Sequence, residues 1–181
     1  MTMEEIPQIK ASRVLHWTGS VTEEKLEKIS ADLAKISLER KDPIMLALSN
    51  FGGSCSYGFG FYDLVRFVLK PKLFTLVIGS VESMGIILFL AATEKRVMTK
   101  NSTLFLHETG KELKAGRYSN TGLRNLSKDN DNFHLLYANI VAENSNGNLS
   151  ADSVLKMMHE EKRIFPEEAK ELGLCDVILS V

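Results

Sequence analysis

Cysteine is scarce in this sequence, with Cys55 and Cys175 the two such residues among 181. They lie far apart and lack the spacing of metal ligands, so they predict small apolar side chains rather than a disulfide framework or a metal site. An excess of charge of one sign is also lacking, because 22 basic and 23 acidic residues leave a formal net charge of −1. This balance excludes the basic surface of a nucleic-acid-binding protein, so we expect no nucleic-acid partner.

A long hydrophobic run is absent as well. The longest apolar stretch, over residues 84–92, is well short of the roughly 20 residues that cross a bilayer, so it predicts a buried element. The start of the chain, MTMEEIPQIK, has neither the basic segment nor the apolar run of a secretory signal. We therefore expect no membrane partner and a cytoplasmic location.

The bulk composition predicts one folded domain over residues 1–181. A hydrophobic share of 44% and a charged share of 25% are ordinary for a globular protein. A chain of this length can bury a substantial core, and two full domains are not expected.

The spacing of apolar residues predicts the order of the elements. Leu26, Ile29 and Leu33 recur with the period of an amphipathic helix, and Thr22 followed by Glu23 suits its N-terminus. The same reasoning predicts strands over residues 13–17, 44–48, 73–78, 96–98, 103–107 and 176–179, and helices over residues 21–40, 57–69, 83–92, 118–143, 150–162 and 166–172. Such alternation predicts an α/β protein with a parallel sheet, whose sites form at the carboxyl ends of the strands.

Acyl transfer by a hydroxyl group needs an exposed serine, a base within reach and donors for the oxyanion. Ser83 opens an apolar helix directly after a strand, and His107 closes a strand before the polar Glu108. Taken alone, such a serine is more often a helix cap, and such a histidine is more often a loop residue bonded to backbone. The pair Gly52 and Gly53 fits an oxyanion donor, but it also fits an ordinary turn.

The order and spacing of several motifs narrow these alternatives. Together they resemble the proteolytic subunit of the Clp proteases, and the resemblance extends from about Arg13 to Leu179. The motifs that carry it are Arg13-Val-Leu…Thr18-Gly19, Asn50-Phe-Gly-Gly, Gly60-Phe-Tyr-Asp63, Glu82-Ser-Met-Gly85, Lys95-Arg96, Leu106-His107 and Glu168-Ala…Leu172-Gly-Leu…Asp176.

The resemblance implies a role for several residues. Ser83 matches the nucleophile, His107 the general base, and the backbone amides of Gly53 and Met84 the oxyanion hole. It also implies a ClpP-like and crotonase-like α/β fold of repeated β-β-α units, with a protruding handle helix in the region of about residues 110–145. Ring-shaped homo-oligomers and a peptide or unfolded protein as substrate follow from the same resemblance, and it implies no metal or organic cofactor.

The sequence departs from the family pattern at the third member of the catalytic triad. Counting back from Glu168-Ala169 places this acid at Met157, or at Met158 with a shift of one residue. Neither side chain can orient His107. The third member is therefore left unassigned, with Glu160 as a candidate and Glu161 beside it.

Further departures concern the surroundings of the site. Glu82 replaces a small residue before Ser83, Glu108 and Thr109 replace Gln-Pro after the histidine, and Phe51 replaces a proline. About 12 residues precede Arg13, so we do not expect docking to a Clp ATPase. The pattern over residues 156–169 is similar to that of ClpP-like peptidases of phage, some of which act without an ATPase.

Three functions are consistent with these observations. The leading hypothesis is a serine endopeptidase that uses Ser83 and His107. A catalytically silent ring subunit with an assembly or peptide-binding role is the alternative, because the acid is missing and Glu82 lies beside the nucleophile. A crotonase-type acyl-CoA enzyme is the third, since one fold supports many chemistries.

Overall fold

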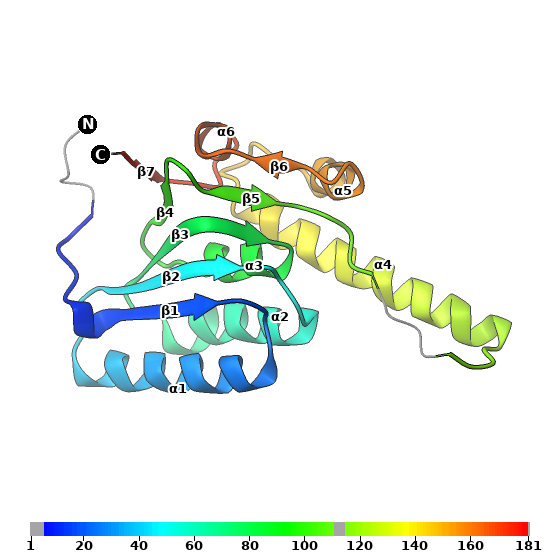
Figure 1. Cartoon of the computed structure of the whole chain (residues 1–181), viewed down its shortest axis with the longest axis horizontal. Coiled ribbons are helices and arrows are strands. Elements are labelled where there is room, and N and C mark those ends of the chain that lie inside the picture. Colours follow the sequence, from blue (N-terminus) through cyan, green and yellow to red (C-terminus); the bar gives the residue numbers. More distant parts are fainter. Residues whose placement is uncertain (1–5, 111–114, 181) are drawn as a thin grey trace.

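A parallel sheet forms the centre of the computed structural model, which describes residues 6–110 and 115–180 (Figure 1). Its strands lie in the order β1 (Val14–Thr18), β2 (Ile44–Asn50), β3 (Leu73–Glu82), β4 (Arg96–Thr99) and β7 (Val177–Leu179). Strand β5 (Thr103–Phe105) pairs in parallel with the end of β3, and the short β6 (Arg163–Ile164) pairs antiparallel with β5. The predicted α/β class and the predicted parallel pairing are therefore present.

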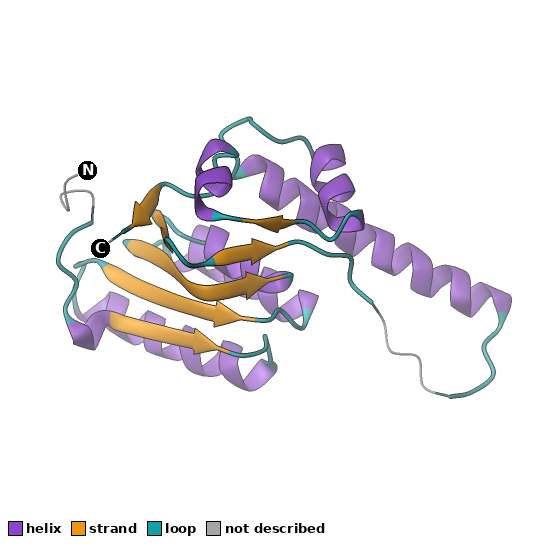
Figure 2. Cartoon of the chain, turned by 45° about the horizontal axis from the view of Figure 1, so that its top comes forward, coloured by secondary structure: helices purple, strands orange, loops and turns teal. Residues whose placement is uncertain are grey.

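Helices cover one face of this sheet and lie along one of its edges (Figures 1 and 2). Helices α1 (Glu23–Glu39), α2 (Cys55–Asp63) and α3 (Met84–Leu90) cover one face, and α2 continues into a π-helical segment, η3 (Leu64–Leu69) (Figures 1 and 2). Helix α4 (Asn120–Glu143) projects well beyond the sheet, and α5 (Ala151–His159) and α6 (Pro166–Glu171) lie beside its base. A short 3-10 turn, η2 (Ala11–Arg13), precedes β1.

Helix α1 shows how the sequence specifies a local element. The Thr22 hydroxyl accepts a hydrogen bond from the N–H of Lys25, and acidic residues occupy the first turn, where they suit the helix dipole. Ile29 and Leu33 are buried on the face that packs toward the sheet. These contacts stabilise the helix more than its intrinsic propensity does.

The connection from α1 to β2 is held by the buried side chain of Arg13, which is 6% exposed. Its guanidinium donates to the carbonyl oxygens of Ile36, Arg40, Asp42 and Pro43, at 3.3, 3.0, 2.7 and 3.0 Å. A buried charge is tolerated here because backbone acceptors surround it.

Strand β3 differs from its predicted length. Gly79 was expected to end the strand, yet β3 continues to Glu82. Leu48 pairs with Val77 but Asn50 pairs with Val81, so β3 carries extra residues in a bulge, and Gly79 has a φ of +75° there. A glycine at a bulge interrupts the apolar pattern without ending the strand.

Two further differences lie near the carboxyl ends of the strands. Strand β5 ends at Phe105, so His107 lies in the segment that follows it. Strand β6 was not predicted, because its two residues are too few for a periodic pattern.

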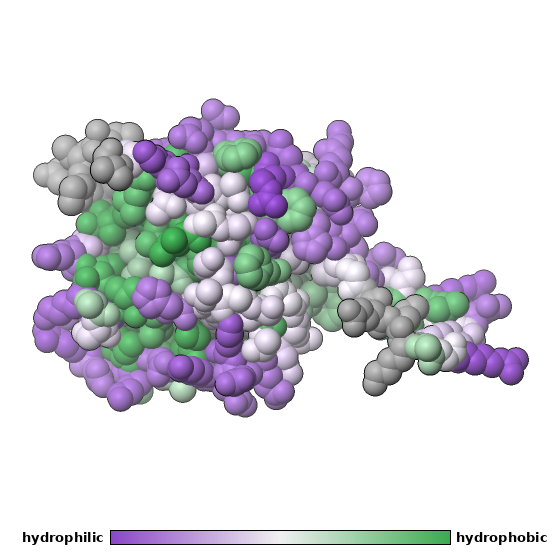
Figure 3. All heavy atoms as spheres, viewed as in Figure 1, coloured by the Kyte–Doolittle hydropathy of each residue, from purple (hydrophilic) through white to green (hydrophobic). Residues whose placement is uncertain are grey.

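Apolar side chains appear over the sheet on the face that α1–α3 leave uncovered, as Figure 3 shows. Within residues 6–110 and 115–180, no helix is long and apolar enough to cross a membrane.

Candidate active site

Ser83 lies at the sharp turn between β3 and α3, with φ 50° and ψ −126°. Its N–H donates to the carbonyl oxygen of Phe105 at 2.8 Å, and its own carbonyl oxygen accepts from the Tyr137 hydroxyl at 3.2 Å. The Ser83 hydroxyl makes no hydrogen bond to another described residue. The backbone of this serine is therefore fixed in an unusual conformation, and the residue is only 7% exposed in the single chain.

Gly52 passes close to Ser83 at the end of β2. A Cβ atom at Gly52, where φ is +82°, would lie 2.7 Å from the Cβ of Ser83. The buried Asn50 shapes this turn, because its side-chain oxygen accepts from the N–H of Gly52 at 2.7 Å. Only a glycine allows the two chain segments to approach this closely.

Gly53 pairs with Val21, which follows β1. The N–H of Val21 donates to the Gly52 carbonyl at 2.7 Å, and the N–H of Ser54 donates to the Val21 carbonyl at 3.1 Å. Gly53 lies between the two residues that bond to Val21. In a parallel pairing, the N–H and C=O of such a residue point away from the partner segment. The N–H of Gly53 is therefore directed away from β1, toward the side of β2 where β3 lies.

Met84 begins helix α3 and is 1% exposed. A Cβ atom at Gly58 would overlap the Met84 side chain, so Gly58 gives this methionine room against α2. The first N–H groups of a helix have no intrahelical acceptor. The N–H of Met84 therefore has no acceptor within α3, and it is the next backbone donor after Ser83 in the chain.

His107 lies next to the turn that carries Ser83. Glu82 pairs with Phe105 in the β3–β5 register, and His107 follows two residues later. The imidazole is half-buried and stacks on the Phe105 ring, with centroids 5.5 Å apart. No hydrogen bond joins His107 to Ser83 among the described residues. The structure thus brings the two predicted residues to the same edge of the sheet.

The candidates for the acid have different surroundings. Met158 is buried in the core and Met157 is partly buried. Glu160 ends α5, and its carboxylate lies 3.8 Å from the Lys156 ammonium at the surface. Glu161 follows with a φ of 52°.

A register links Glu161 to the segment that carries His107. Leu104 pairs with Ile164 and Phe105 pairs with Arg163, and the N–H of Leu106 donates to the Lys162 carbonyl at 2.9 Å. His107 and Glu161 are the next residues on these two antiparallel segments. The sequence placed Glu161 near the missing acid but had no signal for this pairing.

The carboxylates that were expected beside the site are both paired. The Glu82 carboxylate accepts from the Ser80 hydroxyl at 2.9 Å and lies 3.6 Å from the Arg163 guanidinium. Glu108 lies 3.3 Å from the ring nitrogen of His159. The Arg163 guanidinium also stacks over the Phe105 ring, 4.4 Å from its centroid.

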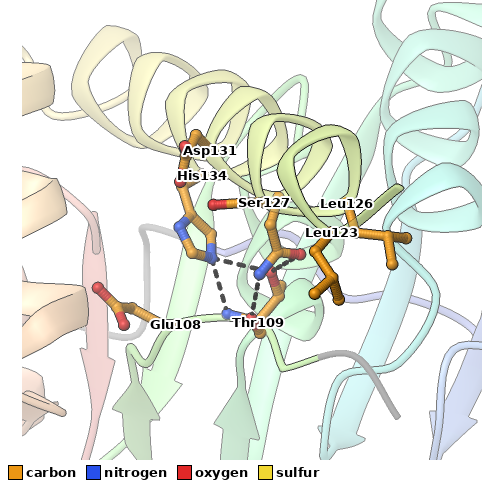
Figure 4. A pocket seen from close by; sticks show the side chains of 8 residues that line it. Glu108, Thr109, Leu123, Leu126, Ser127, Asp131 and His134 are labelled. Carbon is orange, nitrogen blue, oxygen red and sulfur yellow. Dashed lines mark hydrogen bonds between the residues drawn. The ribbon is translucent and has the colours of Figure 1, made fainter. Parts of the chain in front are cut away.

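A pocket of about 380 Å³ opens beside the segment after His107, against one side of α4 (Figure 4). Its lining is polar, with leucines toward the outer end of the helix, and comprises Glu108, Thr109, Leu123, Leu126, Ser127, Asn130, Asp131 and His134. Among the described residues, no group of three or more His, Cys, Asp or Glu side chains could hold a metal ion.

Comparisons with known proteins agree on one family. A family model described as Clp protease matches residues 2–181. The chain is 26% identical over 172 residues to the ATP-dependent Clp protease proteolytic subunit 3 of Rhizobium meliloti (strain 1021), covering 93% of this chain and 84% of that protein.

Solved structures show the same fold. A mutant of ClpP1 from Listeria monocytogenes superposes with a TM-score of 0.81 at 23% identity, over 94% of this chain and 92% of the other. The ClpP-like α/β fold that the sequence predicted is confirmed.

Proposed function

Because this chain belongs to the Clp protease family, we propose that it is a serine endopeptidase that cuts peptides or unfolded proteins through an acyl-enzyme. The observation that carries the proposal is the conformation of Ser83. A non-glycine residue with a φ of 50° costs about 1–3 kcal/mol, and the hydroxyl of this residue has no hydrogen-bond partner among the described residues. Such strain clusters where a site needs a preset geometry.

The proposed reaction uses His107 as base and then as acid. His107 takes the proton of Ser83 Oγ as this oxygen attacks the carbonyl carbon of the scissile peptide bond. The tetrahedral intermediate collapses when His107 returns the proton to the leaving amine. Water then hydrolyses the ester, with His107 again accepting the proton.

The N–H groups of Gly53 and Met84 are the proposed oxyanion donors. The N–H of Gly53 is directed away from β1, because Gly53 pairs with Val21. The N–H of Met84 belongs to the first residue of α3, next to Ser83 in the chain. Two preset donors of this kind stabilise the developing charge and typically contribute about 10²–10³ in rate each.

We propose Glu161, rather than Glu160, as the carboxylate that orients His107. Continuing the β5–β6 register by one residue beyond Leu106 and Lys162 places Glu161 opposite His107. Glu160 instead points to Lys156. A carboxylate beside the base would hold its tautomer and stabilise the imidazolium.

We further propose that the chain assembles into a ring-shaped homo-oligomer. Leu135 and Leu136 of α4 are 48% and 51% exposed. Paired exposed leucines on a projecting helix favour a partner chain.

One observation favours a second candidate, the catalytically silent ring subunit. No hydrogen bond joins Ser83 to His107, or Glu161 to His107, among the described residues. A site assembled by neighbouring subunits and a site that never forms would both show this.

Labelling with a fluorophosphonate probe, read by intact mass, tests the proposal on the purified chain. We expect one adduct that disappears in Ser83→Ala and persists in Ser12→Ala, since Ser12 is an exposed serine outside the site. An assembled, folded sample that takes no label would support the silent subunit and contradict the peptidase.

A further inference from the structure

Thr109 lies two residues after His107 and is held by two side chains of α4 (Figure 4). Its N–H donates to Nε2 of His134 at 3.0 Å, and its carbonyl oxygen accepts from the Asn130 amide at 2.7 Å. Its hydroxyl lies 3.2 Å from the Asn130 oxygen and 2.8 Å from His134 Nε2. Every polar group of Thr109 is thus bound by Asn130 and His134.

The same face of α4 also reaches Ser83. Asn130, His134 and Tyr137 follow at intervals of four and three residues, which places them along one side of a helix. Tyr137 is 4% exposed, and its hydroxyl donates to the Ser83 carbonyl at 3.2 Å. Burial raises the pKa of Tyr137 well above its usual range, so the hydroxyl stays a donor at any working pH.

The bond from Thr109 requires an unprotonated His134. A backbone N–H can only donate, so Nε2 of His134 must accept. A protonated imidazole carries donors on both nitrogens, and its Nε2–H would face the Thr109 N–H. Protonation therefore opposes this contact.

The charged groups around His134 offer its proton another partner. Glu108 and Asp131 line the same pocket, one from the segment after His107 and one from α4 itself. His159 of α5 lies 3.3 Å from Glu108 and competes for that carboxylate. A proton on Nε2 is accepted by the Thr109 hydroxyl at 2.8 Å or by one of these carboxylates, and in either case the bond from the Thr109 N–H is lost.

We propose that Asn130, His134 and Tyr137 form a positioning stripe on α4 that sets the placement of His107 relative to Ser83, and that the stripe works only with His134 neutral. The proposal rests on the proposed function, since it concerns the same two residues. The stripe touches no substrate, so its members are positioning residues.

The test compares His134→Gln with His134→Leu in peptide hydrolysis. Glutamine keeps an acceptor near the place of Nε2 but cannot be protonated in this range, whereas leucine has no acceptor. We expect His134→Leu to lower kcat about tenfold, the rate equivalent of one hydrogen bond, with KM changed less than kcat. His134→Gln should restore most of the rate, and the exposed His16→Gln is the matched control.

The pH profile separates positioning from mere packing. We expect kcat of the wild type to fall on the acid side with a dependence on two protons, those of His107 and His134. In His134→Gln this limb should depend on one proton. Equal slopes in the two proteins, or a full rate in His134→Leu, would overturn the stripe.

A second measurement keeps the test independent of activity. Amide hydrogen exchange at residues 108–110 should be faster in His134→Leu than in His134→Gln, with thermal unfolding used to confirm that both variants fold. Equal protection would overturn the stripe. A folded wild type without hydrolysis would instead contradict the proposed function, while hydrolysis that is unaffected by the variants contradicts the stripe alone.

Discussion

Backbone strain in this chain coincides with the candidate site. Among the described residues, four that are not glycine have positive φ: Lys70, Ser83, Asn146 and Glu161. Two of them are the proposed nucleophile and the proposed acid. Ser83 is held in place by hydrogen bonds at both its N–H and its carbonyl oxygen, so neighbouring elements sustain the strain.

Glu161→Gln tests the assignment of the acid. We expect kcat for peptide hydrolysis to fall about 10- to 100-fold, less than the roughly 10⁴ known for a buried triad aspartate, because Glu161 is exposed in the single chain. The amide keeps the shape but removes the charge that stabilises the imidazolium.

The neighbouring Glu160→Gln is the control for this prediction, since its carboxylate faces Lys156 at the surface. Steady-state kinetics on both variants decides between them. A loss of rate in Glu160→Gln with Glu161→Gln unaffected would reverse the assignment.

Gly52→Ala tests the close approach of β2 to Ser83. A methyl group there would lie 2.7 Å from the Cβ of Ser83, at a φ of +82°. We expect the free energy of unfolding to fall by about 1–3 kcal/mol and peptide hydrolysis to be lost.

Gly60→Ala is the matched control, because Gly60 lies in α2 with nothing within 4 Å of the added atom. It should stabilise the protein by about 0.5–1 kcal/mol. Thermal unfolding of both variants gives the comparison. Equal effects of the two substitutions would contradict the steric argument.

At the scale of elements, the periodic ones were predictable and the short ones were not. The pattern of Leu26, Ile29 and Leu33 gave α1 to within two residues at each end. The expected helix over residues 118–143 is α4, which begins after the Ser119 cap despite its polar first half. Two-residue β6 depends on tertiary pairing with β5, and no local pattern encodes that.

Sequence motifs predicted part of the candidate site, and the contacts that surround it were not predictable. Ser83 lies at the turn between β3 and α3, His107 follows β5 by two residues, and the order of the sequence motifs linked them. Tyr137 reaches a carbonyl oxygen 54 positions away in the chain, and His134 reaches a backbone N–H. A bond from a side chain to a distant peptide group leaves no mark in composition or periodicity, so the positioning stripe was visible only in three dimensions.

A buried ion pair joins two distant elements at the other end of the sheet. The Arg96 guanidinium of β4 donates to both Asp176 oxygens, at 3.0 and 2.7 Å, and to the carbonyl of Asn144. Burial alone would raise the pKa of Asp176, but the hydrogen bonds and charge of Arg96 outweigh it and lower that pKa from 3.8.

Asp176→Asn should therefore destabilise the protein by about 3 kcal/mol, since it leaves the Arg96 charge without its partner. In the wild type this contribution is complete above pH 3.8 and is lost as the pH falls through the lower folded-state pKa. Urea unfolding at several pH values measures both effects.

The exposed pair of Arg40 and Asp42, 3.0 Å apart, is the control for this prediction. Asp42→Asn should change the free energy of unfolding by less than about 1 kcal/mol. If Asp176→Asn lowers the free energy of unfolding no more than Asp42→Asn does, the pair of Arg96 and Asp176 stabilises the protein no more than an exposed pair.

At the scale of the whole molecule, α4 projects beyond the sheet (Figure 1). Leu123, Leu135 and Leu136 are 44%, 48% and 51% exposed along this helix. Because about half of each side chain is already buried, covering the rest gives roughly 1 kcal/mol each, which favours association through α4.

Replacing both Leu135 and Leu136 with aspartate should weaken assembly, because a desolvated charge at an interface is costly. Light scattering after size exclusion should show a large particle for the wild type and a smaller one for the double variant. Leu38→Asp, at an 87% exposed position of α1, is the control. A wild-type protein that elutes as a stable monomer would contradict the ring.

The hydrogen bonds of the buried Arg13 bear on how easily a protease could cut the chain between α1 and β2. Cleavage requires a segment that can be drawn out in extended form, with its carbonyl oxygens free to bond to the protease. The link between α1 and β2 has three of these oxygens, those of Arg40, Asp42 and Pro43, bound to one guanidinium. If the chain is the peptidase proposed above, we expect this link to be a poor substrate for other copies of the protein.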